Sequence, residues 1–397
     1  MTERLLVGNM SYFNAQLPPM DFARRIPLLR ERFSVLGIDA LLVTSLENIS
    51  YLTGFTGSAA YLLVAKDKAL VTTDGRYGEQ IGIQTSAGGV ETEICVGNIT
   101  EQLKALSGLA VSAGCKRIGF EESVSWALLK RIAQMFSCDI HESDDSSGSD
   151  APGDSGSYLV PVNQGVEKLR SVKDEGEIAR IRRACQIADL ALADVKSLLK
   201  TGISEEDFAT ELDYKMKKFS AVRPSFDTIV ASGEHSAMPH ASPTDRIIQE
   251  GDLVVIDFGA EVDGYHSDMT RTYAVGHLSR EMTEVYEAVA ASQEAGVKAV
   301  RAGVSCADVD LVCRSVLEEK DLSKVFSHGT GHGVGLLIHE APYLGPASTD
   351  ILTAGSVVTV EPGAYLAGKG GVRIEDTVVV MQDTCEVLTQ TIKECIY

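Results

Sequence analysis

Carboxylates that interrupt apolar, strand-forming segments constrain the fold of this chain more than any other feature. Residues 251–276, GDLVVIDFGAEVDGYHSDMTRTYAVG, have the pattern of a β-hairpin in which Asp268 lies eleven residues after Asp257. If residues 261–264 form the turn, the two carboxylates stand directly opposite each other on one face, about 5 Å apart. Like charges in such an apolar setting are costly unless they protonate or bind a cation. The hairpin therefore predicts a cation site on a sheet.

A second hairpin repeats this arrangement. In residues 356–381, SVVTVEPGAYLAGKGGVRIEDTVVVM, Glu361 and Glu375 lie fourteen residues apart around Gly368 and can face each other across the strands. A single acid in such a place is usually a surface residue or a turn cap. Two inward pairs on two hairpins are much harder to explain in that way, so we expect all four carboxylates to converge.

The histidines add a nitrogen donor to this set. Seven of the eight lie between residues 235 and 339, and three of them fall in HGTGHGVGLLIHE, residues 328–340. Glycine at every second position disfavours a helix and favours a strand, with His328 and His332 on one face and room for another backbone on the other. One imidazole with four carboxylates is a donor set for hard or borderline ions such as Mn²⁺ or Co²⁺. Four acids can also hold two ions, about 3.5–4 Å apart.

The remaining sequence suggests two domains. Residues 1–141 alternate short helices and strands, with a helix over 20–36 and strands in IDALLVTS, NISYLTGF and AAYLLVAKDKALVTTDGRY, which predicts an α/β domain. Residues 142–157, ESDDSSGSDAPGDSGS, are too polar to pack and predict a solvated loop or linker. Residues 158–397 predict an α+β domain with an amphipathic helix over 173–199 and helices beginning at Ser204, Ser279 and Ser305.

Composition argues against two classes of partner. The net charge of −20 and the absence of a basic patch predict no binding to nucleic acid. No apolar run approaches the roughly 18 residues of a membrane span, and the first twenty residues lack the pattern of a secretory signal. The eight cysteines form no C-x-x-C pair. We therefore expect a cytoplasmic protein that contacts neither membrane nor nucleic acid.

These motifs resemble the pita-bread metallopeptidases, the family of methionine aminopeptidase, aminopeptidase P and prolidase. The segment 328–340 resembles the proline-peptidase signature at every position, while NISYLTGFTGS and TTDGRY resemble the amino-terminal domain of the proline-specific branch. The resemblance implies an α+β carboxy-terminal pita-bread catalytic domain that follows a creatinase-like α/β domain. It also implies a homodimer.

The resemblance assigns a role to each residue of the expected site. It implies two divalent ions, Mn²⁺ first with Co²⁺ or Zn²⁺ as alternatives, and the five ligands Asp257, Asp268, His332, Glu361 and Glu375. Asp268 and Glu375 would bridge the ions, and Glu361 would exchange a proton with a bridging hydroxide that attacks the peptide bond.

By the same resemblance, the other polar residues would contact or support the substrate. His240 and His339 would bind the peptide and its oxyanion, His328 would line the pocket, and Arg373 would support the ligands.

The expected substrates are peptides with proline at the second position. Prolidases resembling this chain carry an arginine between the equivalents of His339 and Glu361 that binds the dipeptide carboxylate, but EAPYLGPASTDILTAGSVVTV contains no Arg or Lys. We therefore favour an Xaa-Pro aminopeptidase over an Xaa-Pro dipeptidase (prolidase). Two further alternatives are a metal-free creatinase-like amidinohydrolase and a non-catalytic pita-bread binding protein, both of which predict lost ligands.

Overall fold

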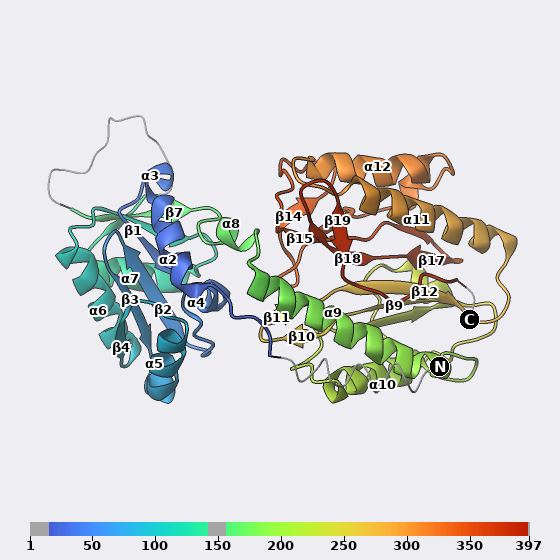
Figure 1. Ribbon diagram of the computed structural model, residues 1–397, viewed down its shortest axis with the longest axis horizontal. Coiled ribbons are helices and arrows are strands. Elements are labelled where there is room, and N and C mark those ends of the chain that lie inside the picture. Colours follow the sequence, from blue (N-terminus) through green and yellow to red (C-terminus); the bar gives the residue numbers. More distant parts are fainter. Residues whose placement is uncertain (1–15, 142–155, 396–397) are drawn as a thin grey trace. The chain divides into compact units, whose positions relative to one another are not determined.

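The chain divides into two compact units. The computed structural model describes residues 16–141 and 156–395 (Figure 1). One unit comprises Met20–Arg170, and the other comprises Ser171–Tyr397 together with the chain before Met20. None of the helices in these described ranges is both long and apolar enough to cross a membrane.

The amino-terminal unit is built on a seven-stranded mixed sheet in the order β4-β3-β2-β1-β5-β7-β6. The strands are β1 (Ala40–Val43), β2 (Ala60–Ala65), β3 (Ala69–Thr73), β4 (Glu93–Val96), β5 (Arg117–Glu121), β6 (Asp139–Ile140) and β7 (Tyr158–Val162). The α-helices are α2 (Phe22–Glu31), α3 (Phe33–Leu36), α4 (Leu46–Thr53), α5 (Gly78–Ala87), α6 (Ile99–Ser112), α7 (Trp126–Phe136) and α8 (Glu167–Arg170). The predicted α/β class of this unit is confirmed.

Two details of this unit differ from the expectation. Strand β7 pairs in parallel with both β5 and β6, so the unit extends to Arg170 and the catalytic unit begins after residue 158. The predicted connector at 142–157 thus joins two strands of one domain, and its residues 142–155 lie outside the described residues. The segment NISYLTGF does not form a strand: residues 46–53 are the helix α4, because the Ser45 side chain accepts a hydrogen bond from the Asn48 amide and caps it.

The carboxy-terminal unit contains two main antiparallel sheets. One has three strands in the order β12-β9-β8: β8 (Ile229–Ser232), β9 (Leu253–Phe258) and β12 (Met269–Ala274). The other has five in the order β14-β13-β15-β18-β19: β13 (Gly331–Gly333), β14 (Glu340–Leu344), β15 (Val357–Val360), β18 (Asp376–Val380) and β19 (Cys385–Val387). Two short hairpins extend them: β10 (Glu261–Val262) with β11 (Tyr265–His266), and β16 (Gly363–Leu366) with β17 (Gly370–Arg373).

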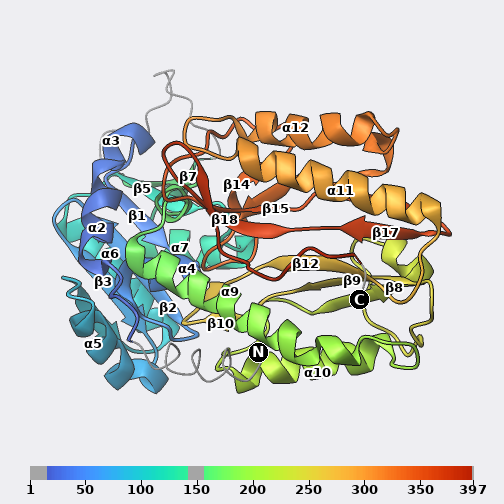
Figure 2. The same cartoon turned by 45° about the vertical axis from the view of Figure 1, so that its right-hand side comes forward.

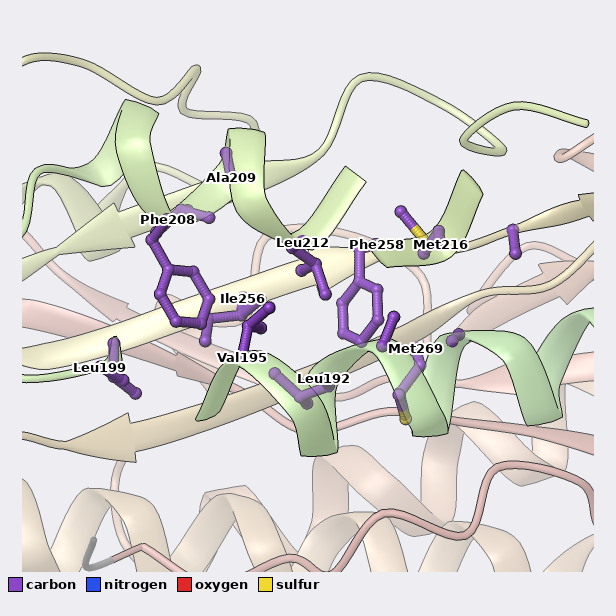
Figure 3. Close-up of a cluster of buried hydrophobic side chains, with 14 of the residues drawn as sticks. Leu192, Val195, Leu199, Phe208, Ala209, Leu212, Met216, Ile256, Phe258 and Met269 are labelled. Carbon is purple, nitrogen blue, oxygen red and sulfur yellow. The ribbon is translucent and has the colours of Figure 1, made fainter. Parts of the chain in front are cut away.

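Helices cover both sides of these strands. The pair α9 (Glu175–Val195) and α10 (Glu205–Lys218) lies on one side, and α11 (Arg280–Ala299) and α12 (Cys306–Glu318) lie on the other (Figures 1 and 2). Figure 3 shows Leu192, Phe208 and Leu212 of the first pair packed against Ile256 and Phe258 of β9. Burial of these side chains holds β9, the strand that carries Asp257, in place, at about 1.5–3 kcal/mol for each large apolar residue.

The predicted helix starts are confirmed. Ser204, Ser279 and Ser305 are the N-caps of α10, α11 and α12, and each accepts a hydrogen bond from a backbone amide of the first turn. The amphipathic stretch at 173–199 forms α9, which begins after Asp174 in a complete capping box. The predicted α+β class of this unit is confirmed as well.

Candidate metal centre

The first predicted hairpin forms with a different register. Asp257 pairs with Thr270, not with Asp268, because the turn consists of two residues, Asp263 and Gly264, instead of the four expected. Both turn residues have left-handed φ values, 51° and 84°, as a tight hairpin turn requires. The correction moves Asp268 from the directly opposed position to a diagonal one on the same face, because the register shift is even.

The second hairpin has the predicted register. Val360 pairs with Asp376 on one side, and Gly363 pairs with Arg373 on the other. Glu361 and Glu375 lie between these two pairs, at the same register, so they face each other across the hairpin.

The 328–340 segment contributes only a short strand, β13, with a bulge after His332. Its glycines are required by close packing, as the alternation predicted. A Cβ atom on Gly331 would lie 2.0 Å from the Thr359 carbonyl oxygen, and one on Gly333 would lie 2.4 Å from that of Ala341. The close approach of these backbones brings His332 to the two hairpins.

All nine predicted site residues line one cavity of about 840 Å³: His240, Asp257, Asp268, His328, His332, His339, Glu361, Arg373 and Glu375. They come from the loop after β8, the two hairpins and the segment around β13. The cavity is also lined by apolar groups, including Phe226, Ile338 and Leu344. Polar groups that converge at one end of an apolar pocket are typical of a ligand site.

The potential ligand atoms lie close together. One donor atom each of Asp268, His332 and Glu375 lies within 4.8 Å of the others. The Nε2 atom of His332 lies 3.2 Å from Glu361 Oε1 and 3.5 Å from Asp268 Oδ2. Its Nδ1 atom lies 3.1 Å from the Gly333 carbonyl oxygen, which orients Nε2 toward the carboxylates.

The electrostatics of this cluster are those of a cation site. Burial, followed by the charges of neighbouring carboxylates, raises the pKa of Asp268 and that of Glu375 well above the usual range. Glu361 differs: burial alone would raise its pKa, but His332 and the charges of His328 and Arg373 hold it at about 2.

The donor set fits divalent ions. Asp257 Oδ1 and Glu375 Oε1 are buried without a hydrogen-bond partner, although most buried oxygens are satisfied. Carboxylate oxygens and one imidazole are suitable ligands for Mn²⁺ or Co²⁺. A bound cation would satisfy the two orphaned oxygens and relieve the repulsion that raises the carboxylate pKa values.

Arg373 supports two of the carboxylates. Its Nη2 atom donates to Asp257 Oδ2 at 2.6 Å, and its Nε atom donates to Thr270 Oγ1 at 3.1 Å. The Thr270 hydroxyl in turn donates to Glu375 Oε2 at 2.7 Å. This guanidinium positions the ligands and is itself held by the carbonyl of Pro239 and the hydroxyl of Tyr365.

Tyr365 is a site residue that the sequence analysis missed. Its hydroxyl lies 2.8 Å from His328 Nε2 and accepts a hydrogen bond from Arg373. The His328 Nδ1 atom lies 2.8 Å from the Gly329 carbonyl, and burial lowers the pKa of this imidazole. Tyr365 therefore donates a hydrogen bond to a neutral His328 and links this imidazole to Arg373.

Two threonines and an aspartate were also missed. The Thr359 hydroxyl accepts from the His332 amide and donates to Glu361 Oε1. Asp310 of α12 accepts from the amide and hydroxyl of Thr330, which lies midway between His328 and His332. Each threonine lies two residues along the chain from a predicted site residue, Thr359 from Glu361 and Thr330 from His332, and this spacing is the signal that could have identified them.

Comparisons with known proteins agree with this architecture. Residues 25–148 match the creatinase/prolidase N-terminal domain, and residues 179–382 match metallopeptidase family M24. A Bacillus subtilis protein named uncharacterized peptidase YqhT is 40% identical over 94% of this chain and 99% of its own length. An Xaa-Pro dipeptidase of Pyrococcus horikoshii is 33% identical over 90% of this chain and 95% of its own.

Two solved structures are similar in fold and sequence. The Xaa-Pro dipeptidase from Bacillus anthracis has a TM-score of 0.86 and 36% identity, covering 94% of this chain and 99% of that one. The X-Pro aminopeptidase from Thermotoga maritima has a TM-score of 0.79 and 34% identity, covering 93% and 99%. With a creatinase-like amino-terminal domain followed in sequence by a pita-bread catalytic domain, the chain belongs to metallopeptidase family M24.

Proposed function

We propose that this protein is an Xaa-Pro aminopeptidase, which removes the first residue from peptides of three or more residues with proline at the second position. The observation that carries this choice is the charge of the cavity wall. Among its described lining residues, Arg373 is the only one with a guanidinium or ammonium group, and Asp257 already pairs with it. A dipeptide would place its terminal carboxylate here without a strong cationic partner.

Neighbouring groups strengthen this argument. Burial lowers the pKa values of His328 and His339, so both are neutral at pH 7 and give little attraction to a carboxylate. Asp227, an exposed residue that lines the same cavity, would repel a carboxylate and attract an amino group. A peptide that continues beyond proline has an amide at that place, and an amide needs no counter-charge.

The proposed roles follow from the positions of the side chains. Asp257, Asp268, His332, Glu361 and Glu375 would hold two divalent ions, with Mn²⁺ the first candidate. The ions would supply Lewis acidity, which activates water and polarises a carbonyl. Glu361, whose carboxylate lies beside His332 in the same cavity, would accept a proton from water and pass it to the leaving proline nitrogen.

The histidines would act on the substrate itself. His339, whose ring centre lies 4.3 Å from that of His332, and His240 would donate hydrogen bonds to the peptide and its oxyanion. His328, held by Tyr365, would line the proline pocket. The homodimer expected from the family resemblance stays a prediction.

A dipeptidase is the second candidate, favoured by the names of several relatives. The similar proteins from Pyrococcus horikoshii and Bacillus anthracis are both named Xaa-Pro dipeptidase. In that case the carboxylate anchor would have to come from a group outside the lining residues of this cavity.

Hydrolysis of Ala-Pro-Ala and Ala-Pro by chelator-stripped protein, before and after addition of Mn²⁺, tests the proposal. We expect metal-dependent release of alanine, with kcat/KM for the tripeptide at least tenfold higher. Preference for the dipeptide would establish the second candidate. Asp268→Asn serves as the metal-site control, and absence of cleavage with every divalent ion would refute both peptidase assignments.

A further inference from the structure

The two bridging candidates are joined by a reciprocal pair of contacts on their main chains. Asp268 lies just before β12, and Glu375 lies just before β18, so neither belongs to a strand. The Thr377 hydroxyl donates to the Asp268 carbonyl oxygen at 2.7 Å. In return, Arg271 Nη1 donates to the Glu375 carbonyl oxygen. The carbonyl of Asp268 is thus bound by Thr377, which follows Glu375 in the chain, and the carbonyl of Glu375 is bound by Arg271, which follows Asp268.

The two hairpins are joined along this line by side-chain hydrogen bonds to the backbone in addition to a backbone hydrogen bond. In the backbone bond, the Glu375 amide donates to the Thr270 carbonyl at 3.2 Å. One step further along, the Thr272 hydroxyl donates to the Arg373 carbonyl at 2.7 Å and accepts from the Arg373 amide. We call the contacts of Arg271, Thr272 and Thr377 with the opposite backbone the seam.

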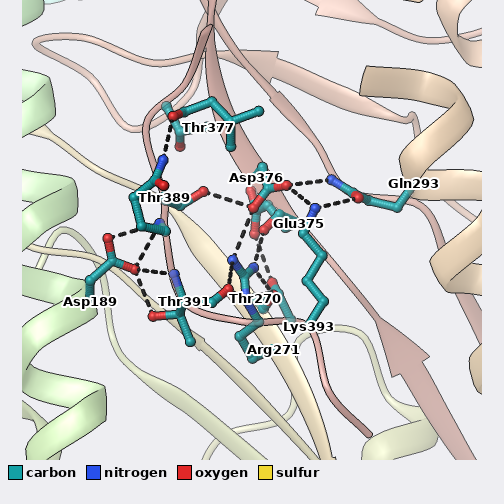
Figure 4. Close-up of polar contacts among 12 residues, drawn as sticks. Asp189, Thr270, Arg271, Gln293, Glu375, Asp376, Thr377, Thr389, Thr391 and Lys393 are labelled. Atoms are coloured by element: carbon teal, nitrogen blue, oxygen red, sulfur yellow. Dashed lines mark hydrogen bonds and ion pairs between the residues drawn. The ribbon is translucent and has the colours of Figure 1, made fainter. Parts of the chain in front are cut away.

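A buried ionic cluster fixes Arg271 behind the seam (Figure 4). Its Nη2 atom lies 2.9 Å from Asp376 Oδ1 and 2.8 Å from the Thr391 carbonyl oxygen. Gln293 Nε2 donates to the other Asp376 oxygen at 2.9 Å, and Lys393 forms an ion pair with it. The side chains of Arg271 and Asp376 are 1% exposed or less, so a change of geometry here cannot be absorbed by solvent.

We propose that Arg271 and Thr377 are positioning residues that set the separation of Asp268 and Glu375, and thereby the affinity of the centre for its ions. Neither side chain contacts a ligand carboxylate in any hydrogen bond described here; both act on the ligand backbone from the opposite hairpin. The cluster of Asp376, Lys393 and the 389–393 segment keeps Arg271 in the orientation that this requires. The inference rests on the metal assignment in the proposed function.

Successive side chains along each segment point in opposite directions, so one residue can face the cavity while the next one contributes to the seam or to the cluster behind it. Glu375 lines the cavity and accepts a hydrogen bond from the Thr270 side chain, whereas the next residues along each segment, Arg271 and Asp376, pair with each other and do not line it. The seam ties the Asp268 carbonyl to Thr377 and the Glu375 carbonyl to Arg271, so the two ligand backbones keep a fixed separation and the carboxylates are preorganised for the ions.

Thr377→Val tests the proposal, with Thr73→Val as the matched control. Each variant removes one buried strand hydroxyl that donates to a backbone carbonyl at 2.7 Å, and Thr73 donates to Ala59 in the amino-terminal unit. Titration of the chelator-stripped proteins with Mn²⁺ by calorimetry, with urea unfolding of the same samples, separates metal affinity from general stability. We expect Thr377→Val to weaken binding of at least one ion about 10–100-fold, as the loss of outer contacts commonly does. Thr73→Val and the conservative Thr377→Ser should stay within about threefold of wild type.

Arg271→Lys provides an independent variant. It keeps the buried charge but cannot bind the Glu375 carbonyl oxygen and the Asp376 carboxylate with two separate nitrogen atoms. We expect it to weaken Mn²⁺ binding at least as much as Thr377→Val. Equal affinities for Thr377→Val and Thr73→Val would overturn the inference while leaving the metal centre intact. Failure of the wild-type protein to bind Mn²⁺ or Co²⁺ would overturn the metal assignment as well, so the two failures are distinguishable.

Discussion

The Arg373 guanidinium donates to Asp257 at 2.6 Å and leaves the other oxygen of that carboxylate unpaired toward the cavity. Arg373 thus binds Oδ2 of Asp257, and Oδ1 of the same carboxylate stays available for a metal ion. Four carboxylates and one guanidinium carry a formal charge of −3, which protons or metal ions must balance in a buried site. Burial and the neighbouring carboxylates raise the pKa of Asp268 and that of Glu375, in line with this excess of negative charge.

Removal of the Arg373 charge should destabilise the protein by about 3–5 kcal/mol, because Asp257 would remain buried without its counter-ion. Urea unfolding of Arg373→Met measures this loss. Tyr365→Phe, which removes one hydroxyl from the same network, should cost only about 1 kcal/mol. The double variant Arg373→Met/Asp257→Asn should recover part of the stability, and no recovery would argue against the ion pair as the cause.

Asp268→Asn should abolish metal binding and activity while leaving the metal-free protein at least as stable as wild type, since one charge is removed from a crowded cluster. Thermal unfolding with and without Mn²⁺ distinguishes these effects. Wild type should gain about 2.7 kcal/mol when the ion is present at 100 times its Kd. A similar gain in the variant, or full peptidase activity, would contradict the role of Asp268 as a ligand.

Glu205 should make the stability depend on acid pH. Burial alone would raise its pKa, but hydrogen bonds from Ser232, Thr244 and His235 outweigh burial and lower the pKa below the ordinary value of 4.5. The stabilisation is therefore complete above about pH 4.5 and is lost as the pH falls through the folded-state pKa.

Urea unfolding of Glu205→Gln from pH 7 to pH 3 measures this contribution. The difference in free energy of unfolding between variant and wild type should be largest at neutral pH and shrink below pH 4.5. The exposed neighbour Glu206 provides the control, and Glu206→Gln should differ little from wild type at any pH. A gap that stays constant with pH would contradict the assignment. Because Glu205 binds both ends of residues 232–244, Glu205→Gln should also raise KM through the displacement of His240.

Gly331→Ala should destabilise the catalytic domain by about 1–3 kcal/mol or more, because its methyl group would lie 2.0 Å from the Thr359 carbonyl oxygen. It should also weaken metal binding through the displacement of His332. Gly108→Ala is the opposite case: this exposed glycine in α6 has open space around it and should gain about 0.5–1 kcal/mol. Calorimetric unfolding of the two variants should give shifts of opposite sign.

Ser348→Arg should shift preference toward dipeptides, because it adds a guanidinium to the lining of the cavity that lacks a free one. A charge-assisted hydrogen bond of about 1.5–3 kcal/mol predicts a 10–100-fold rise in kcat/KM for Ala-Pro relative to Ala-Pro-Ala. Ser348→Gln, a long neutral side chain, should leave the ratio unchanged. A shift of the same size in both variants would mean that shape, and not charge, sets the preference.

The site could be predicted in outline from the sequence because its signals are local. Serine caps fixed the starts of three helices, and symmetry about Gly368 placed Glu361 opposite Glu375. The register of the first hairpin was wrong because the sequence does not distinguish a four-residue turn from the tight Asp263-Gly264 turn that forms. Asp257 and Asp268 nevertheless lie on the same face of the sheet, as predicted, because a register shift of two residues does not move a side chain to the other face.

Other features depend on contacts distant in sequence. Residues 46–53 have β-branched and aromatic side chains typical of a strand, but the cap at Ser45 and burial against the sheet make them helical. Strand β7 follows the polar segment 142–157 and still pairs with β5 and β6 of the amino-terminal sheet, which a boundary drawn from composition cannot foresee. Tyr365 is identified only once β16 and β17 place it beside Arg373.

The contact between Arg271 and the Thr391 carbonyl has a consequence for how the protein is made. Every candidate ligand lies between residues 257 and 375, and domains generally fold as they emerge from the ribosome. Yet the support of Arg271 includes residues 391 and 393, which are synthesised after all the ligands. A nascent chain therefore presents its candidate ligands before residues 391 and 393 can fix their spacing. Full metal affinity should arise only after these residues have left the ribosome.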